Sequence, residues 1–304
     1  MSNKRSFYSN GKLLITGEYL VLNGAHALAL PTKFGQLLHI SPLEQQTIIW
    51  QSFDQDGSCW FETQLAFTDI KQKINFEEDP IKQTLIHILH YAFKQNPTFL
   101  ENQGYTIQTE LTFPRNWGLG TSSTLINNIA QWLQIDAFQL LRESFGGSGY
   151  DIACAQNDTA ILYQLENELP HVQIVSFDPK YKEQLYFVYL NQKQNSRHAI
   201  QHYMNKQAFL QKETEKINAI TQDLLVSNEM EHAAQLLEKH EIILSTILEL
   251  PTVKERLFPD FKGTIKSLGA WGGDFVLVVS EENPTSYFKN KGYETILKYE
   301  EMIL

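Results

Sequence analysis

The order of strand-like and helix-like segments along this chain predicts an α+β fold. Strand-like runs dominate residues 7–65, a helical pattern follows at 80–95, and later strands and helices occur in blocks instead of strict βα repeats. The chain has 304 residues, of which 42% are hydrophobic, so it can build one large or two ordinary cores. We therefore expect a mixed α+β protein with no internal repeat.

The first half of the chain is expected to contain one long helix among strands. Residues 11–32 read as strand, tight turn, strand, and strand-like GQLLHISPL and QTIIWQSF follow. The helix at 80–95 has apolar residues at helical spacing and starts with Pro80, a residue favoured in the first helical turn. Strand-like YTIQTELTF then leads into a turn of small residues.

The second half alternates blocks of strands and helices. A long helical tract is expected over residues 196–249, with a break near Ser227 and Asn228. Strand-like runs precede and follow this tract, together with one short helix near PTSYFKN; the strands are TAILYQL, VQIVSF, QLYFVYL, TIKSLGA, FVLVV and YETILKYEE.

The turn of small residues, PRNWGLGTSST at 114–124, carries the strongest chemical signal. It runs directly into the helical pattern LINNIAQWL, and free N–H groups at the start of a helix attract anions. Gly118 and Gly120 let the backbone approach a phosphate closely, and the hydroxyls of Thr121, Ser122 and Ser123 can bond phosphate oxygens or magnesium. Similar clusters also serve as ordinary helix caps, so this segment alone supports both interpretations.

Three segments together resemble the GHMP kinases, which phosphorylate small molecules. GKLLITGEYLVL resembles the first motif of that family, PRNWGLGTSST its PxxxGLGSSAA phosphate loop, and GAWGGD its third motif. The resemblance spans residues 11–280. It implies a two-lobed α+β fold, with a ribosomal protein S5 domain 2-like N-terminal lobe at 1–190, a ferredoxin-like C-terminal lobe at 191–304, and an active site between them.

The resemblance also implies ATP and Mg²⁺ as cofactors. Residues Gly118, Leu119, Gly120, Thr121, Ser122 and Ser123 would bind the ATP phosphates, and Ser122 would ligate magnesium. The family has alanines where this chain has Ser123 and Thr124, which indicates either an altered ligand contact or a surface variation. Glu143 is the nearest candidate for a second magnesium ligand, although an exposed helical glutamate is an equal alternative.

Asp151 is implied as the base that accepts the proton of the attacking hydroxyl. The segment GSGYD resembles the family segment that carries the catalytic aspartate, and Lys12 would keep this carboxylate ionised. A helix-capping aspartate and a solvated lysine are the ordinary alternatives.

The remaining site candidates belong to the first motif and to the third-motif loop. Glu18 is expected to be structural or part of a substrate pocket, and Tyr19 resembles the phosphomevalonate kinases. Trp271 replaces a family glycine, so its indole must either narrow the pocket or turn outward. The other candidates of the third-motif loop are Gly269, Gly272, Gly273 and Asp274, and Ser196 lies where relatives carry a Ser/Thr-rich substrate loop.

The resemblance implies an acid of the mevalonate pathway as the small-molecule substrate. Few arginines favour mevalonate over phosphomevalonate, because a substrate phosphate usually needs several cations. The alternatives are a phosphomevalonate kinase, a diphosphomevalonate-type decarboxylase, a sugar or amino-alcohol kinase, and a nucleotide sensor without activity. Both a monomer and a homodimer are compatible with the sequence.

The composition excludes several other classes. A net charge of −10 and a pI near 5.4 argue against nucleic acid and anionic membranes as partners. Two cysteines cannot form a disulfide framework, and no apolar run is long enough to span a bilayer, so we expect a cytoplasmic protein. Histidine pairs lack a third metal ligand, and neither GxxxxGK[ST] nor GxGxxG is present.

Overall fold

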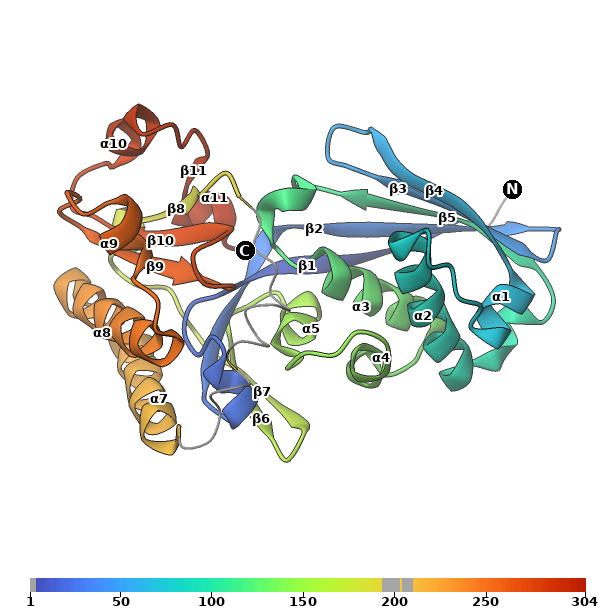
Figure 1. Cartoon of the computed structure of the whole chain (residues 1–304), viewed down its shortest axis with the longest axis horizontal. Helices are drawn as coiled ribbons and strands as arrows, with labels where there is room; N and C mark the ends of the chain where they lie inside the picture. Colours follow the sequence, from blue (N-terminus) through green and yellow to red (C-terminus); the bar gives the residue numbers. More distant parts are fainter. Residues whose placement is uncertain (1–3, 193–202, 204–209) are drawn as a thin grey trace. The chain divides into compact units, whose positions relative to one another are not determined.

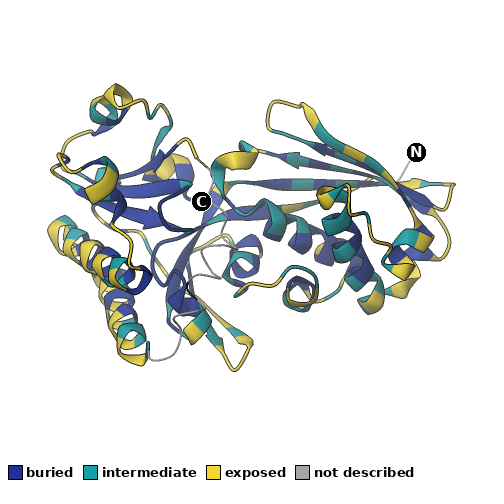
Figure 2. Ribbon diagram, in the orientation of Figure 1, coloured by how far each residue is buried: buried dark blue, intermediate teal, exposed yellow. Residues whose placement is uncertain are grey.

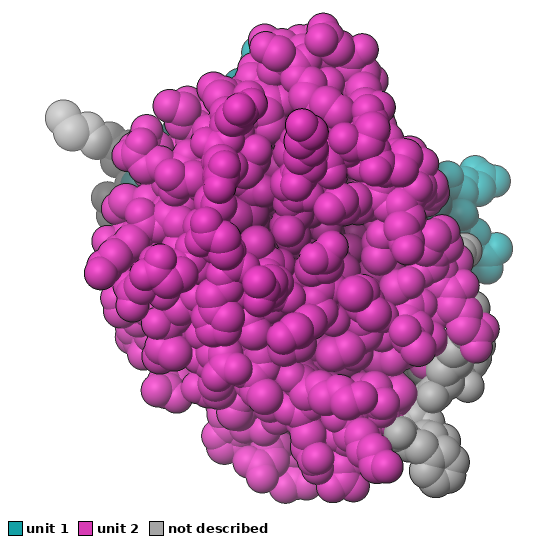
Figure 3. Space-filling view, turned by 90° about the vertical axis from the view of Figure 1, so that its left-hand side faces the viewer, with its two compact units in different colours: residues 1–11, 34–115, 120–156 teal, residues 12–33, 116–119, 157–304 magenta. Residues whose placement is uncertain are grey.

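The computed structural model describes residues 4–192, 203 and 210–304, which divide into two compact units (Figure 3). Unit 1 comprises residues 1–11, 34–115 and 120–156, and unit 2 comprises residues 12–33, 116–119 and 157–304. The units are interleaved along the sequence, whereas the lobe boundary near residue 190 that the sequence analysis expects stays a prediction.

The sheet of unit 1 is formed by strands that are far apart in the sequence. Their hydrogen-bonded order is β4 (Cys59–Ala66), β3 (Thr47–Phe53), β5 (Gly104–Leu111) and β2 (Ala27–Leu43). The β3–β5 pair is parallel, and the β3–β4 and β2–β5 pairs are antiparallel. β1 (Arg5–Leu14) pairs with β2, whose 17 residues are shared between the two units.

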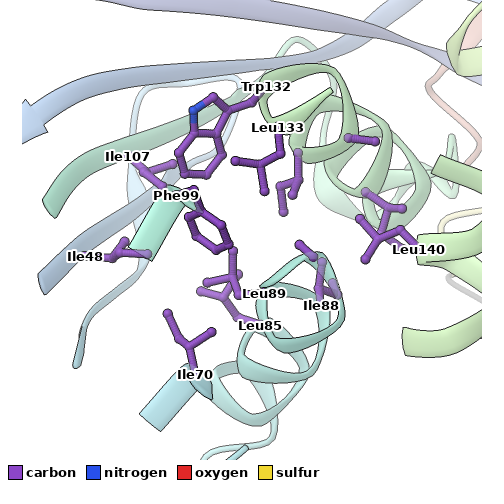
Figure 4. Packing of buried hydrophobic residues seen from close by; sticks show 14 of the residues in the cluster. Ile48, Ile70, Leu85, Ile88, Leu89, Phe99, Ile107, Trp132, Leu133 and Leu140 are labelled. Atoms are coloured by element: carbon purple, nitrogen blue, oxygen red, sulfur yellow. The ribbon is translucent and has the colours of Figure 1, made fainter. Parts of the chain in front are cut away.

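Helices of unit 1 cover this sheet with apolar side chains. The helices are α1 (Phe67–Gln72), α2 (Pro80–Gln95), α3 (Thr121–Leu133), α4 (Ala137–Ser144) and α5 (Tyr150–Ala155), with a 3-10 turn at Pro97–Leu100. Their core contains Trp132 and Leu89 from helices and Ile48 and Ile107 from strands, all at most 5% exposed (Figure 4). The helix predicted at 80–95 is confirmed. Pro80 is its first residue, and the carboxylate of the preceding Asp79 caps the helix by accepting a hydrogen bond from Lys82 N.

Unit 2 contains a second sheet and the end of the first. β6 (Ile161–Glu166) pairs with β2 residues 27–29, and β7 (Leu169–Ile174) pairs with β6. The second sheet is antiparallel, in the order β11 (Ile296–Lys298), β8 (Leu185–Tyr189), β10 (Phe275–Val279) and β9 (Thr264–Leu268). Every residue of β8, β9 and β10 is buried (Figure 2).

Unit 2 has two long helices, one of which packs on β9 while the other packs against the first (Figure 1). They are α7 (Gln211–Val226) and α8 (Met230–Leu248), which confirms the break predicted near Ser227 and Asn228. Short helices complete the unit: α9 (Val253–Leu257), α10 (Thr285–Asn290), α11 (Tyr299–Met302) and the 3-10 turns Leu20–Asn23 and Lys182–Gln184.

The α+β fold class predicted from the sequence is confirmed, although individual elements differ from the prediction. The expected tight turn in residues 11–32 contains the 3-10 turn Leu20–Asn23, closed by Gly24 at φ 81°. The last strand is only three residues long, because the chain turns into α11 at Tyr299. None of the helices in the described part of the chain combines the length and apolarity that crossing a bilayer requires.

Candidate functional site

The middle of the turn of small residues belongs to unit 2, where its aromatic residue anchors it. Residues 116–119 belong to this unit, and the 3-10 turn Arg115–Trp117 overlaps their first two residues. The Trp117 ring meets Phe275 of β10 edge-on at 5.4 Å between centroids and lies 6.4 Å from the ring of Tyr189. These ring contacts hold the residue before Gly118 against the second sheet.

Lys12 of the first motif makes two contacts with this turn. Its backbone N–H donates to Leu119 O at 3.0 Å, and its ammonium donates to Gly118 O at 3.0 Å. The ammonium is therefore held beside the turn, where it can offset negative charge on a phosphate. Its predicted pairing with Asp151 stays a prediction.

Asp274 of the third motif reaches the same glycine. Gly118 has φ +67°, and a Cβ at this position would lie 2.1 Å from Asp274 Oδ2, so no larger residue fits without rearrangement. Asp274 itself is held by hydrogen bonds from its N–H to Gln192 O and from Leu190 N–H to its carbonyl. Three segments that are far apart in the sequence therefore meet at Gly118.

The third-motif loop, defined here as residues 269–274, is held by side chains that the sequence analysis did not select. The carbonyl of Gly272 accepts hydrogen bonds from Arg256 Nη2 at 3.2 Å and from Gln192 Nε2 at 2.7 Å. Gly273 N–H donates to Ala270 O at 3.2 Å, which closes the turn. Arg256 and Gln192 lie 16 and 80 residues from Gly272, and no local pattern connects them to this loop.

Trp271 does not turn outward, which was one of the two orientations considered for it; a narrowed pocket stays a prediction. Its indole is only 9% exposed, so it does not turn outward. The ring N–H donates to Pro251 O at 3.2 Å, between α8 and α9, and the backbone N–H donates to the Tyr19 hydroxyl at 2.7 Å. The indole packs within unit 2 and anchors the loop.

Glu18 is structural, one of the two roles considered for it. Its side chain is 3% exposed, and its Oε1 accepts a hydrogen bond from the Lys266 ammonium at 2.5 Å. Neighbouring Tyr19 is 6% exposed, with φ +63°, a conformation that non-glycine residues rarely adopt. Glu18 and Tyr19 of the GEY sequence thus join elements of unit 2.

The second half of the turn opens α3 in unit 1. Gly120 has φ +97° and the helix begins at Thr121. The N–H groups of Thr121, Ser122 and Ser123 have no acceptor among the described residues, since the first cap bond runs from Thr124 N to Gly120 O. This is the arrangement that binds phosphate at a helix N-terminus.

The hydroxyls of α3 divide into two groups. Ser123 and Thr124 are buried; Ser123 donates to Gly120 O, and Thr124 bonds Gln36 Oε1 at 2.7 Å. These two residues stand where the GHMP kinases have alanine. Because both are buried and their hydroxyls bond protein oxygens, this difference is neither a surface variation nor a ligand contact through the hydroxyl. The half-buried Ser122 hydroxyl has no hydrogen bond within the described structure, so it is available for a ligand.

Two predicted carboxylates lie on other helices of unit 1. Asp151 is the second residue of α5, is half-buried, and accepts a hydrogen bond from Ile152 N at 3.1 Å. Glu143 lies on the exposed side of α4, where Gln139 donates to it at 3.1 Å. This environment is typical of a surface glutamate. Ser196 lies outside the described residues.

The residues present fit a magnesium ion that is shared with a ligand. Among the described residues, no three His, Cys, Asp or Glu side chains gather into a possible metal site. A protein-only cage is therefore not formed by these residues, but Mg²⁺ commonly uses one or two protein oxygens together with waters and phosphates. The available Ser122 hydroxyl meets that requirement.

Comparison with solved structures identifies the fold. The chain matches a Streptococcus pneumoniae phosphomevalonate kinase in complex with phosphomevalonate and AMPPNP at a TM-score of 0.70 and 17% identity, covering 97% of this chain and 99% of that one. It matches the Methanococcus jannaschii mevalonate kinase at a TM-score of 0.69 and 16% identity, covering 97% and 96%. Lactococcus lactis galactokinase complexed with galactose matches at a TM-score of 0.68 and 11% identity, covering 95% and 88%.

No protein-family model and no curated protein sequence matches the chain. The structural similarities show that this protein has the fold shared by these kinases.

Proposed function

We propose that this protein is an ATP-dependent kinase that transfers the γ-phosphoryl group of MgATP to a small-molecule hydroxyl, with mevalonate as the acceptor. The observation that carries the proposal is the meeting of Lys12, Gly118 and Asp274, one from each motif, at a turn that opens α3. Phosphoryl transfer depends mainly on positioning and on neutralising charge, and these residues supply both.

The chain's own groups have distinct roles in this proposal. The N–H groups of Thr121, Ser122 and Ser123 bind phosphate oxygens, and the Lys12 ammonium offsets their charge. Ser122 would hold magnesium with Glu143 as a second ligand, and the ion would neutralise charge on the phosphate oxygens. Asp151 accepts the proton of the attacking hydroxyl.

The choice of mevalonate rests on the supply of cations. A phosphorylated acceptor carries nearly two negative charges, which proteins usually meet with several Arg or Lys side chains. The five arginines of the chain include Arg256, which contacts the third-motif loop and can meet one carboxylate. Tyr19 and the sequence GSGYDIA instead favour phosphomevalonate, so this is the second candidate acceptor.

The substitution Asp151→Asn separates a kinase from a nucleotide sensor. It preserves the shape of the side chain but removes the base, so acceptor-dependent ADP release should fall about 10²- to 10⁴-fold while ATP affinity changes little. Asp223→Asn, on the exposed surface of α7, is the matched control and should behave as wild type. Tight ATP binding by the wild type without turnover on a broad acceptor panel would support the sensor and reject the kinase.

A further inference from the structure

Unit 2 buries four ionisable side chains in one cluster, which we define as Glu18, His240, Glu241 and Lys266. Their side chains are 0–3% exposed, and they come from the turn after β1, from α8 and from β9. Burying charge is unfavourable unless partners compensate it, so a cluster of this kind needs a defined charge state. The proposed phosphoryl transfer uses none of these four groups directly.

Lys266 supplies the only formal positive charge that these four residues hold. Its ammonium donates to Glu18 Oε1 at 2.5 Å and to Ser267 O at 2.8 Å, and it lies 4.0 Å from Glu241 Oε1. The bond to Glu18 is charge-assisted and short, whereas the distance to Glu241 is too long for a hydrogen bond.

His240 cannot supply a second positive charge. Its Nε2 accepts a hydrogen bond from Gly17 N–H at 3.0 Å, which requires this nitrogen to be unprotonated. Burial, and secondarily the charge of Lys266, lowers the pKa of His240 well below 6.5. The imidazole is therefore neutral.

The cluster then contains two carboxyl groups and one ammonium. The groups around the Glu241 carboxyl are Lys266 and Ser267 of β9, Glu18, and the neighbouring His240; the charge of Lys266 and the interactions with Ser267 both favour its ionised form. Burial raises the pKa of Glu241 from 4.5 to about 7, against the opposing effect of Lys266. With a proton on Glu241 the cluster is neutral; without it, one negative charge is buried and unpaired.

The cluster is connected both to the first motif and to the third-motif loop. Glu18 precedes Tyr19, whose hydroxyl accepts the backbone hydrogen bond of Trp271, and the backbone of Gly269 interacts with the Glu18 carboxylate. Lys266 lies on β9, the strand that leads into the third-motif loop at Gly269. The pair therefore links the first motif to the third within unit 2.

We propose that Glu18 and Lys266 are positioning residues that hold the third-motif loop against the first motif, and that the link is tight only while Glu241 carries a proton. Loss of that proton leaves a second buried carboxylate that competes for Lys266. The consequence for turnover rests on the proposed kinase function; the structural link does not.

Hydrogen exchange of the ligand-free protein tests the link without any activity. Because burial raises the pKa of Glu241 above its unfolded value, its contribution to protection is complete below pH 4.5 and is lost as the pH rises to about 7. Protection factors of peptides covering 12–22 and 264–274, corrected for intrinsic rates, should fall about tenfold or more between about pH 5 and about pH 8.

Two variants on α8 make this test specific. Glu241→Gln fixes the neutral form of this side chain and should reduce the fall in protection factors at least about threefold. A smaller fall should remain because burial also raises the pKa of Glu18. Glu238→Gln, one turn earlier and 52% exposed, should retain the wild-type fall. Equal falls in wild type and Glu241→Gln, or no fall in wild type, would overturn the proposal.

A second measurement covers the case in which Glu241→Gln does not fold. As the pH rises through about 7, the kcat/KM of the wild type should decline. The decline should come from an increase in the KM for the acceptor, while kcat changes less, because the position of the loop is affected and the catalytic base is not. Unchanged acceptor KM over this range, with protection factors also unchanged, rejects the link. If the protection factors fall as expected but the protein shows no turnover, the structural link is supported and the proposed kinase function is rejected.

Discussion

Gly118 connects the three motifs because its missing side chain leaves room for Asp274. The residue also has φ +67°, a conformation that costs little only for glycine. The motif predicted a glycine that approaches phosphate; the structure adds that it accommodates a carboxylate of the protein itself. The contact is specific enough to test by adding one methyl group.

We expect Gly118→Ala to destabilise unit 2 by about 1–3 kcal/mol, from backbone strain and from the contact with Asp274. Gly292→Ala is the matched control, since Gly292 has φ +87° but a Cβ added there would meet no atom within 4 Å. Urea unfolding of both variants isolates the contact. Equal destabilisation by the two substitutions would mean that strain alone matters at Gly118.

The Glu18–Lys266 pair gives a second test at the scale of single residues. Lys266→Met should cost about 3–5 kcal/mol of unfolding free energy, because it leaves Glu18 buried without its cation. Adding Glu18→Gln to Lys266→Met should recover a large part of that loss, since no unpaired charge then remains. A double variant that is less stable than Lys266→Met alone contradicts the pairing.

At the scale of elements, the sequence predicted those whose signals are local. α2 begins at Pro80 and α7 ends at Val226 as expected, because a proline, an aspartate cap and an interrupted apolar pattern all act within a few residues. The shortened last strand and the short helix α9 were missed. These short elements are set by packing in the second core, where Val253 and Phe258 are 1% and 0% exposed.

The first turn of α3 yields a prediction at the same scale. Ser122→Ala should lower kcat/KM about tenfold or more and raise the Mg²⁺ concentration required, since its available hydroxyl is the proposed metal ligand. Ser123→Ala should leave both quantities near wild type, because that hydroxyl already donates to Gly120 O. Steady-state assays over a magnesium series compare the two; a larger effect of Ser123→Ala would reverse the assignment.

At the scale of the whole molecule, the motifs identified the fold but not the contacts that hold the loops. Lys12, Gly118 and Asp274 could be selected from short segments, and the structure brings them together. Lys266, Arg256 and Gln192 could not, because their partners lie 16 to 248 residues away and no local pattern marks them. The inward orientation of Trp271 likewise depends on Pro251 and Tyr19.

The most direct test of the central claim is to identify the product of the reaction. The protein would be incubated with MgATP and either mevalonate or phosphomevalonate, and ³¹P NMR would follow ATP, ADP and the phosphorylated acid. We predict stoichiometric formation of ADP and a new phosphomonoester of mevalonate, with a higher kcat/KM for mevalonate than for phosphomevalonate. A clear preference for phosphomevalonate would reassign the acceptor, and the absence of any acceptor-dependent phosphorylated product, over these acids and a panel of sugars and amino alcohols, would contradict the kinase assignment.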